Sequence, residues 1–245
     1  MIFTIAHKEF RSLFATPSTW LILAALQFLF AWFFLARLDA YLQVQAQLAL
    51  IANAPGATLS VAAALFGTLA LMLMMLIPLF SMRLLAEERR NQTLALLLAA
   101  PVSSSQIVLG KFLSLVLFVA LIIASCTAML CLLGLGTHLD FGLLAANASG
   151  LLLLAASYAA LGLYLSALTK QPIVAATGAT ALSFGLWLLD VGGTDSSLRA
   201  LSPSAHAQSL NAGLILSADL LYFILFIATF LLLTIRRLDN NRLYA

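Results

Sequence analysis

Charged side chains are scarce in this sequence. Only 9% of its 245 residues are Asp, Glu, Lys or Arg and 63% are hydrophobic, whereas about 25% of the residues of an ordinary soluble domain are charged. The mean hydropathy is +1.08. A soluble globular protein could not cover its surface with so few charges, and a disordered chain would contain far fewer apolar residues. The composition therefore indicates a polytopic helical membrane protein.

Residues that carry catalytic or metal chemistry are also few. Cys126 and Cys131 lie in one apolar segment and would point in different directions on a helix, so we interpret them as packing residues rather than a disulfide. None of His7, His138 and His206 has metal-ligand spacing to another His or a Cys. Nucleophile-elbow and Walker motifs are missing. We expect no catalytic residue, metal or cofactor in this chain. If ATP drives its work, a separate ATPase binds the ATP and Mg²⁺.

Six apolar stretches are long enough, or nearly so, to cross a bilayer as helices. They are 18–36, 60–82, 112–133, 143–168, 173–189 and 214–235. The first five contain no charged residue and the sixth contains only Asp219, near its start. A mid-span carboxylate or lysine, of the kind that ion-coupled carriers use, is missing. The sequence thus predicts an all-α integral membrane protein, with one transmembrane domain of six transmembrane helices over residues 1–245.

The charges of the loops predict the orientation. If the N-terminus is cytoplasmic, all of the twelve Lys and Arg residues except Arg37 and Arg199 lie on the cytoplasmic side. The positive-inside rule then places both termini in the cytoplasm. This asymmetry explains the net charge of +3 without nucleic acid, because a nucleic-acid binder needs a dense basic patch on one face. The apolar run of 18–36 is too long for a cleaved signal peptide, so we expect it to be retained.

Residues 1–16 have an amphipathic pattern. At helical spacing, Phe3 and Phe10 gather on an apolar side, and Lys8 and Arg11 gather on a polar side. A short basic helix of this kind, next to a span, would lie on the cytoplasmic surface of the membrane. The alternative is a charged leader that only sets the orientation. We predict an interfacial elbow helix.

The segment 83–111 is the one large cytoplasmic feature. A short apolar helix over Thr93–Leu98 lacks the length to cross the membrane and must pack on something, and Pro101 would end it. Ser103 with Gln106 forms a capping box that would start the third span. The short helix either docks a soluble partner or lies passively at the membrane interface.

The residues of this segment resemble a known signature. Leu85-Ala-Glu-Glu-Arg is followed by Thr93-Leu-x-Leu-Leu-Leu, then by Pro-x-Ser, and then by Gly110-Lys-Phe. The pattern is similar to that of ABC-2-type exporter permeases, which typically read Glu-Glu-x-x-x-Gly-Thr-Leu-Glu-Leu-Leu-Leu, then Pro-x-Ser, then Gly-Lys. Here Gln92 stands where that family usually has Gly, and Ala95 where it often has Glu. Residues 201–223 resemble the gliding-motility-associated branch of these permeases.

The resemblance implies a multi-pass permease of the bacterial inner membrane that pairs with a second permease, as a homodimer or heterodimer, above two copies of an ABC ATPase. It also implies that 83–111 is the coupling region set into the ATPase and that 191–213 is an extracytoplasmic loop. In the gliding-like branch, a membrane-anchored protein with a large periplasmic domain is a further partner. The candidate coupling residues are Glu87, Glu88, Arg89, Arg90, Thr93, Leu94, Leu96, Leu97, Leu98 and Pro101; those of the elbow helix are Phe3, Lys8, Phe10 and Arg11; those of the outer loop are Pro203, His206 and Gln208.

These patterns predict a permease that moves a lipid-like or glycan substrate outward with ATP hydrolysed by a separate subunit. The alternative is a membrane subunit of an ATPase-driven envelope or motility complex with no transported cargo. For His206 two roles stay open: contact with a partner or gating of the exit, and structuring of the loop. The small residues Gly162, Ser166, Ala175 and Ala179 permit close helix contact, either within one subunit or at a dimer interface.

Overall fold

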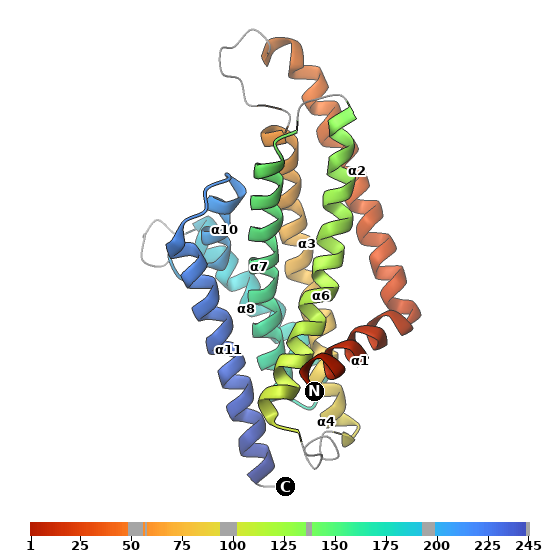
Figure 1. Ribbon diagram of the computed structural model, residues 1–245, viewed down its shortest axis with the longest axis vertical. Coiled ribbons are helices and arrows are strands. Elements are labelled where there is room, and N and C mark those ends of the chain that lie inside the picture. The colour runs from red at the N-terminus through yellow and green to blue at the C-terminus, as the bar shows by residue number, and fades with distance from the viewer. Residues whose placement is uncertain (49–55, 57, 94–101, 136–138, 193–198, 244–245) are drawn as a thin grey trace.

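The computed structural model describes residues 1–48, 56, 58–93, 102–135, 139–192 and 199–243 (Figure 1). Every regular element within these ranges is a helix. Six helices of the described part are long and apolar enough to cross a membrane. The predicted all-α fold with six candidate transmembrane helices is therefore confirmed.

Most of the helices extend beyond the apolar stretches that predicted them. The first span, α2, covers Pro17–Leu48 instead of 18–36. Hydropathy marks only the apolar middle of a span, whereas backbone hydrogen bonding continues into the polar turns at its ends. The other spanning elements are a continuous run of η1 (Thr58–Ala62), α3 (Ala63–Met82), η2 (Arg83–Glu87) and α4 (Glu88–Arg90); α6 (Ser104–Leu130) with η3 (Cys131–Leu135); α7 (Phe141–Leu168); α8 (Pro172–Gly192); and α11 (Ser217–Leu243).

The third span begins well before its prediction. It begins at Ser104 rather than at 112, because the capping box between Ser103 and Gln106 starts the helix two turns earlier. The Ser103 hydroxyl accepts a hydrogen bond from the Gln106 backbone N–H, and the Gln106 side chain accepts one from the Ser103 N–H. Both ends of the predicted cytoplasmic segment 83–111 are thus helical continuations of spans.

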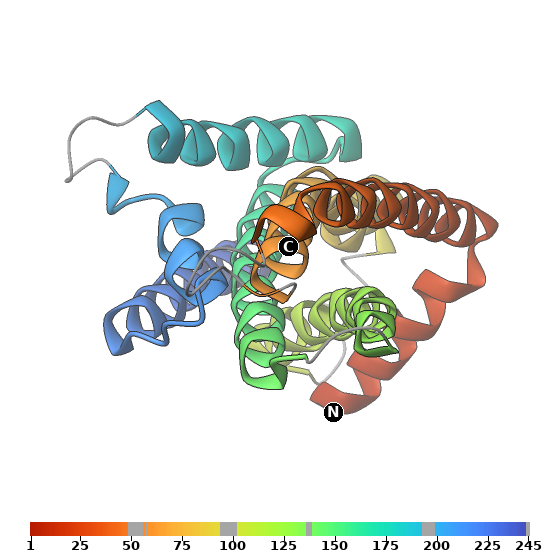
Figure 2. The same cartoon turned by 90° about the horizontal axis from the view of Figure 1, so that it is seen from above.

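The spanning helices run alternately up and down, and both chain ends lie at the same end of the bundle as α1 and α4 (Figure 1). An even number of spans requires this arrangement. Seen from above, α8 lies side-on along the edge of the bundle, so it is strongly tilted from the long axis (Figure 2). A short helix, α10 (Pro203–Asn211), follows α8 in the predicted outer loop and packs against α7 and α8.

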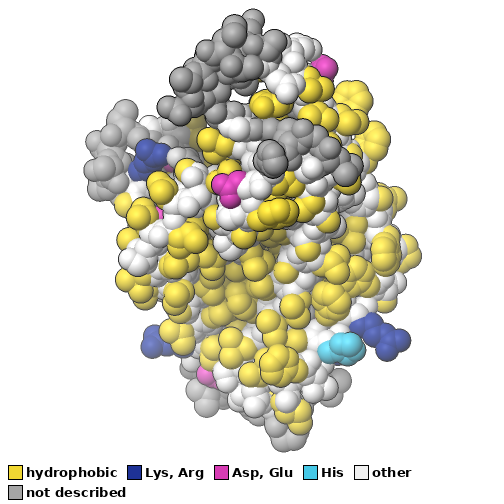
Figure 3. Space-filling model, turned by 45° about the horizontal axis from the view of Figure 1, so that its top comes forward, with side chains coloured by type: hydrophobic (Ala, Val, Ile, Leu, Met, Phe, Trp, Pro, Cys, Tyr) yellow, Lys and Arg dark blue, Asp and Glu magenta, His cyan; other side chains and the backbone are white. Residues whose placement is uncertain are grey.

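The central helix is α7. Of its apolar stretch 72% is buried, compared with 17% in α2 and 22% in both α8 and α11. The outer helices turn large apolar side chains away from the protein, such as Phe28 and Trp32 of α2. On the face shown in Figure 3, hydrophobic side chains form a broad band and the charged side chains lie toward its two ends. A surface of this kind suits a bilayer.

Small side chains let α7 approach its neighbours closely. A Cβ added to Gly162 would collide with the Ser81 side chain of α3. Ser166 of α7 and Ala175 and Ala179 of α8 are buried in the same region. These small residues therefore serve close helix contacts within one subunit.

The two cysteines differ in environment. Both are free; Cys126 is buried and Cys131 is exposed. The prediction that both are packing residues therefore holds only for Cys126.

Candidate functional site

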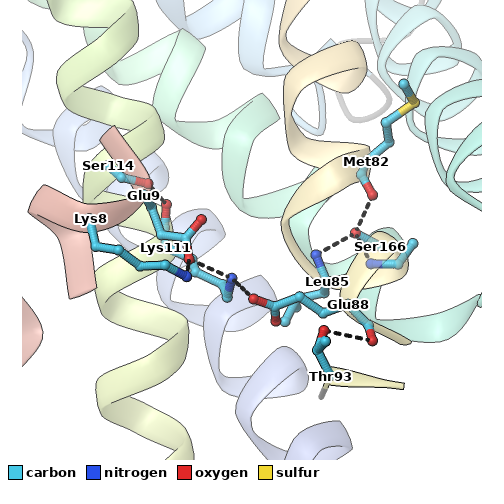
Figure 4. Close-up of polar contacts among 10 residues, drawn as sticks. Lys8, Glu9, Met82, Leu85, Glu88, Thr93, Lys111, Ser114 and Ser166 are labelled. Atoms are coloured by element: carbon cyan, nitrogen blue, oxygen red, sulfur yellow. Dashed lines mark hydrogen bonds and ion pairs between the residues drawn. The ribbon is translucent and has the colours of Figure 1, made fainter. Parts of the chain in front are cut away.

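A buried lysine joins three helices at the end of the bundle that holds both termini. Lys111, in the second turn of α6, is only 1% exposed. Its ammonium nitrogen lies 2.7 Å from Glu88 Oε1 in α4 and 3.2 Å from Glu9 Oε1 in α1, the helix over Ile2–Ala15 (Figure 4). A buried charge requires such partners, because leaving it unpaired away from water is costly. We call Lys8, Glu9, Glu88 and Lys111 the basal charge cluster.

Two members of the basal charge cluster have shifted pKa values. Burial raises the pKa of Glu9, but the nearby ammonium groups of Lys111 and Lys8 outweigh it, and the pKa lies below its usual value. The hydrogen bond to Glu9, 3.0 Å long, raises the pKa of Lys8. Glu9 and Lys8 therefore favour each other's charged forms, and the cluster of two carboxylates and two ammonium groups carries no net charge.

The ion pair between Glu88 and Lys111 closes the base of the predicted coupling segment. These residues are 23 positions apart in the chain. They flank residues 89–110, which make up most of the predicted coupling segment. Thr93 Oγ1 donates a hydrogen bond to the Glu88 carbonyl over 3.3 Å. Glu87, Arg89 and Arg90 lie beside Glu88, and Arg90 is exposed. The candidate residues Leu94, Leu96, Leu97, Leu98 and Pro101 lie outside the described residues.

The backbone of the segment bends at a residue that the resemblance singled out. Gln92 has φ of 59°, in the left-handed region that favours glycine because a Cβ is strained there. The resembling family usually has Gly at this position. The departure from the family pattern therefore leaves a strained turn just after α4.

A serine of the central helix α7 forms hydrogen bonds with the backbone at the start of the coupling segment. The Leu85 and Ala86 N–H groups donate to Ser166 Oγ over 3.2 and 2.9 Å, and Ser166 Oγ donates to the Met82 carbonyl over 2.9 Å (Figure 4). This contact lies in η2, a π-turn in which the ordinary helical hydrogen bonds are interrupted. Sequence reasoning recognised Ser166 only as a small residue, since no pattern marks a hydroxyl that bonds to another helix.

The predicted elbow residues have different positions on α1. Lys8 belongs to the basal charge cluster, and the Phe10 ring packs on the Phe14 ring with centroids 5.0 Å apart. Phe3 is 80% exposed, and Arg11 is also exposed. The helix itself packs along α6, where a Cβ added to Gly110 would meet the side chain of Ile5. It is thus fixed to the bundle through α6.

A cleft of about 680 Å³ opens beside the basal charge cluster. Its walls come from α1, α3, η2 and α4, and include Glu9, Ser12, Arg83, Glu87 and Glu88. The second carboxylate oxygen of Glu88 is buried and has no hydrogen-bond partner among the described residues. The cleft separates α1 from the start of the coupling segment.

The outer-loop candidates lie together in and around α10. His206 Nδ1 lies 2.6 Å from Asp219 Oδ1, its Nε2 lies 3.0 Å from the Ala200 carbonyl oxygen, and its ring stacks on Tyr222. Ser209 also donates a hydrogen bond to the Asp219 carboxylate. Both ring nitrogens of His206 thus have partners in the loop or at the start of α11, which favours the structuring role over partner contact.

The other two outer candidates also have structural partners. Pro203 occupies the first turn of α10, where its missing N–H costs nothing. Gln208 Nε2 donates to Asp190 Oδ2 over 2.6 Å, and its Oε1 accepts a hydrogen bond from Arg199 over 2.9 Å. Arg199 is also paired with Asp190 at 3.1 Å. We call His206, Asp219, Asp190, Arg199 and Gln208 the outer polar cluster.

Comparison with known proteins defines the class. The family model described as ABC-2 family transporter protein matches residues 3–241. The chain therefore belongs to this family, and it is a multi-pass membrane protein and a permease subunit of an ABC transporter, a class that works with an ABC ATPase subunit. None of the curated proteins searched matches the chain significantly. The gliding-motility branch stays a prediction.

Proposed function

We propose that this chain is the transmembrane subunit of an ABC exporter of the bacterial inner membrane, with both termini in the cytoplasm. Two copies of an ATPase bind below it and hold the ATP and Mg²⁺, and a second permease completes the pathway. The basic residues support this orientation, because Lys8 lies in α1, Lys111 pairs with Glu9 of α1, and Arg236 lies in the last part of α11. The C-terminus lies at the same end of the bundle as α1 (Figure 1). The cargo is an apolar or amphipathic molecule that moves outward.

The observation that carries this proposal is the ion pair between Glu88 and Lys111, which joins the two ends of the coupling segment. ATP binding moves the ATPases, and the coupling region 83–111 moves with them as a lever. Because Lys111 binds both Glu88 and Glu9, movement of the lever reaches α4, α6 and α1 together. Ser166 extends the path to the central helix α7 through η2.

A co-purification experiment tests the docking. Leu97→Asp places a carboxylate on the apolar surface of the predicted coupling helix, and it should reduce recovery of the ATPase by about tenfold or more, as loss of a buried anchor does. Arg90→Ala removes one exposed charge and should reduce recovery by less than about fivefold. The full-length permease is extracted from its native membrane in mild detergent, and its level is matched between variants. Equal, wild-type recovery for both variants would contradict docking through this segment.

A flux measurement in vesicles separates export from the alternative without cargo. The complex that retains its ATPase is reconstituted with fluorescent lipids, and ATP-dependent movement of lipid between the leaflets is recorded. Movement of lipid that requires ATP supports an exporter. ATP hydrolysis without movement of lipid or of lipid-linked glycan favours the envelope or motility complex.

A further inference from the structure

The ring of His206 lies between two hydrogen-bond acceptors. Its Nδ1 lies 2.6 Å from Asp219 Oδ1, and its Nε2 lies 3.0 Å from the Ala200 carbonyl oxygen. An ionised carboxylate and a carbonyl oxygen both accept hydrogen bonds and donate none. Both contacts are hydrogen bonds only if each ring nitrogen carries a hydrogen, as in the imidazolium cation and in neither neutral tautomer. Moving the proton from Nδ1 to the carboxyl group would keep both contacts and would not change the number of protons that they hold.

The ring and its carboxylate partner are closely packed, whereas the Ala200 backbone is not. The His206 ring stacks on the Tyr222 ring with centroids 4.0 Å apart, and its side chain is 21% exposed. The other oxygen of the Asp219 carboxylate accepts a hydrogen bond from Ser209. Ala200 lies in an exposed turn before α10. A mismatch at the ring is therefore relieved by movement of this turn rather than by rotation of the ring.

Loss of one proton breaks one of the two contacts. A neutral imidazole has one N–H group and one lone pair. Because a hydrogen bond to a carboxylate is stronger than one to a neutral carbonyl, the remaining hydrogen stays on Nδ1, facing Asp219. Nε2 then presents its lone pair to the Ala200 carbonyl oxygen, and the two repel each other. Histidine is the side chain that ordinarily changes its charge between about pH 5 and pH 8.

The Asp219 carboxylate is the one charged group in contact with the His206 ring within the described part of the chain. The titratable groups of the elements around the ring are Asp219 and Tyr222 on α11, Asp190 on α8, Tyr158 on α7, and Arg199 before α10. Arg199 and Asp190 are paired at 3.1 Å and compensate each other. The helices α3 and α7, which also pack on α10, contain no Asp, Glu, Lys, Arg or His. The protonation of His206 therefore depends mainly on Asp219.

We propose that His206 is a proton-operated latch of the outer polar cluster. In acid, the protonated ring joins the turn at Ala200 to α11; when the ring loses its proton, the bond to Ala200 breaks and the turn 199–202 loosens. This turn leads directly into α10, whose Ser204 and Ala207 line a cavity of about 360 Å³ between α3, α7 and α8. The deprotonated state thus frees the first end of one cavity wall. The latch requires neither an ATPase nor a cargo, so it goes beyond the proposed function and is independent of it.

The protonation of His206 can be measured directly. His7 and His138 are the other histidines of the chain, and changing both to Gln leaves His206 as the only imidazole in the full-length protein, purified in detergent with a tag that lacks histidine. With ¹⁵N-labelled histidine, long-range ¹H–¹⁵N spectra distinguish the cation from the two neutral tautomers. We expect a hydrogen on both nitrogens at about pH 5 and on Nδ1 alone at about pH 9.

Hydrogen exchange of the same protein shows whether the turn follows the ring. After correction for the intrinsic pH dependence of exchange, protection of the amides in 199–206 should fall about three- to tenfold between the two pH values, the effect of one lost hydrogen bond. Asp219→Asn keeps an acceptor but removes the charge that stabilises the cation, so both transitions should move to lower pH. Asp140→Asn is the matched control, because the Asp140 side chain caps α7 instead and Asn caps a helix equally well.

Four results would overturn the latch. His206 could remain neutral, or remain a cation, over the whole pH range, and either result would leave no switch. A change of protonation without a change of exchange in 199–206 would show that the ring does not control the turn. Equal shifts in Asp219→Asn and Asp140→Asn would show that the ring responds to the general charge of the protein and not to its carboxylate partner.

Discussion

The two ends of the bundle both bury charged side chains, but they connect the chain over very different distances. Lys111 binds Glu9, 102 residues away, and Glu88, 23 residues away. In the outer polar cluster, His206 and Asp219 are 13 residues apart and Asp190 and Gln208 are 18 apart. The basal charge cluster therefore joins helices from distant parts of the chain, whereas the outer cluster joins α8, α10 and α11, which follow one another in the chain.

This difference bears on function. A contact between distant segments fixes the relative position of whole helices and passes a displacement from one to another, provided that those helices are rigid. A contact between neighbouring segments fixes only the ends of those segments, here α8 and α11 around α10. We therefore expect changes in the basal charge cluster to loosen the bundle and to uncouple it from the ATPase, and changes in the outer cluster to act only around α10.

The largest effect is expected for Lys111→Met. This change leaves Glu9 without its Lys111 contact and Glu88 without an ion-pair partner in the described part of the chain, and breaking a buried ion pair costs about 3–5 kcal/mol. The unfolding free energy in mixed micelles should fall by that amount. Lys170→Met is the control, because Lys170 is exposed. Equal stability of the two variants would mean that the basal charge cluster does not hold the helices together.

Ser166→Ala should have the next largest effect. It removes the hydroxyl that accepts from two backbone N–H groups of η2, and a buried unsatisfied donor costs about 1–3 kcal/mol. Ser157→Ala is a matched control in the same helix, because Ser157 is equally buried and its hydroxyl bonds only to its own helix, at the Leu153 carbonyl. Unfolding of both variants in mixed micelles measures the difference. If Ser157→Ala lowered the unfolding free energy as much as Ser166→Ala, the hydrogen bonds between Ser166 and η2 would have no special effect on stability.

His206→Ala tests the local character of the outer polar cluster. The loss of its hydrogen bonds to Asp219 and Ala200 should cost about 1–2 kcal/mol. Amide hydrogen exchange should increase in 199–222 and stay unchanged in α1 and α6, and ATPase recovery should be that of the wild type. Faster exchange in α1 would show that the two ends of the bundle communicate, and our comparison would fail.

Gln92→Gly is expected to stabilise the start of the coupling segment. The left-handed conformation of Gln92 costs a residue with a Cβ about 1 kcal/mol, which glycine avoids. Gln92→Ala keeps the Cβ and is the control. A rise in the unfolding temperature is expected only for the glycine variant, and a fall would indicate that Gln92 forms a contact that offsets the strain.

The sequence was sufficient for the fold because membrane spans are encoded locally. Runs of apolar residues predicted six helices, and the charges of the loops predicted an even number of spans. The predicted capping box at Ser103 is also present, and it starts α6 two turns before the apolar stretch, because hydropathy marks only the apolar part of a span. Local patterns of this kind need no knowledge of tertiary contacts.

The site could be predicted only where it depends on a continuous motif. The motif at 85–112 located Glu88 and Lys111, but it could not show that they pair, or that Glu9 completes the cluster. Ser166 carries no local signal, since its partners Met82, Leu85 and Ala86 come from another part of the chain. Local sequence patterns do not predict contacts between segments that are far apart in the chain.

The smallest effect concerns pH, and it follows from the shifted pKa values of Glu9 and Lys8. The pKa of Glu9 is lower in the folded protein than its ordinary value of 4.5. Its contribution to stability is therefore fully present above that value and is lost as the pH falls through the folded pKa. The pKa of Lys8 is raised above its ordinary 10.5, so its contribution is present below that value and is lost as the pH rises through the folded pKa.

The basal charge cluster should therefore contribute a constant amount between the two ordinary pKa values and lose stability at both extremes. Unfolding temperatures of the wild type and of Glu9→Gln, measured from neutral pH down to the acid limit of the detergent, isolate the acid side. Glu9→Gln should be less stable at neutral pH, and the difference should narrow as Glu9 of the wild type is protonated. A difference in unfolding temperature that stays constant with pH would mean that Glu9 stabilises the protein through packing rather than through its charge. The ion pair of Glu9 with Lys111 would then not hold α1 to α6.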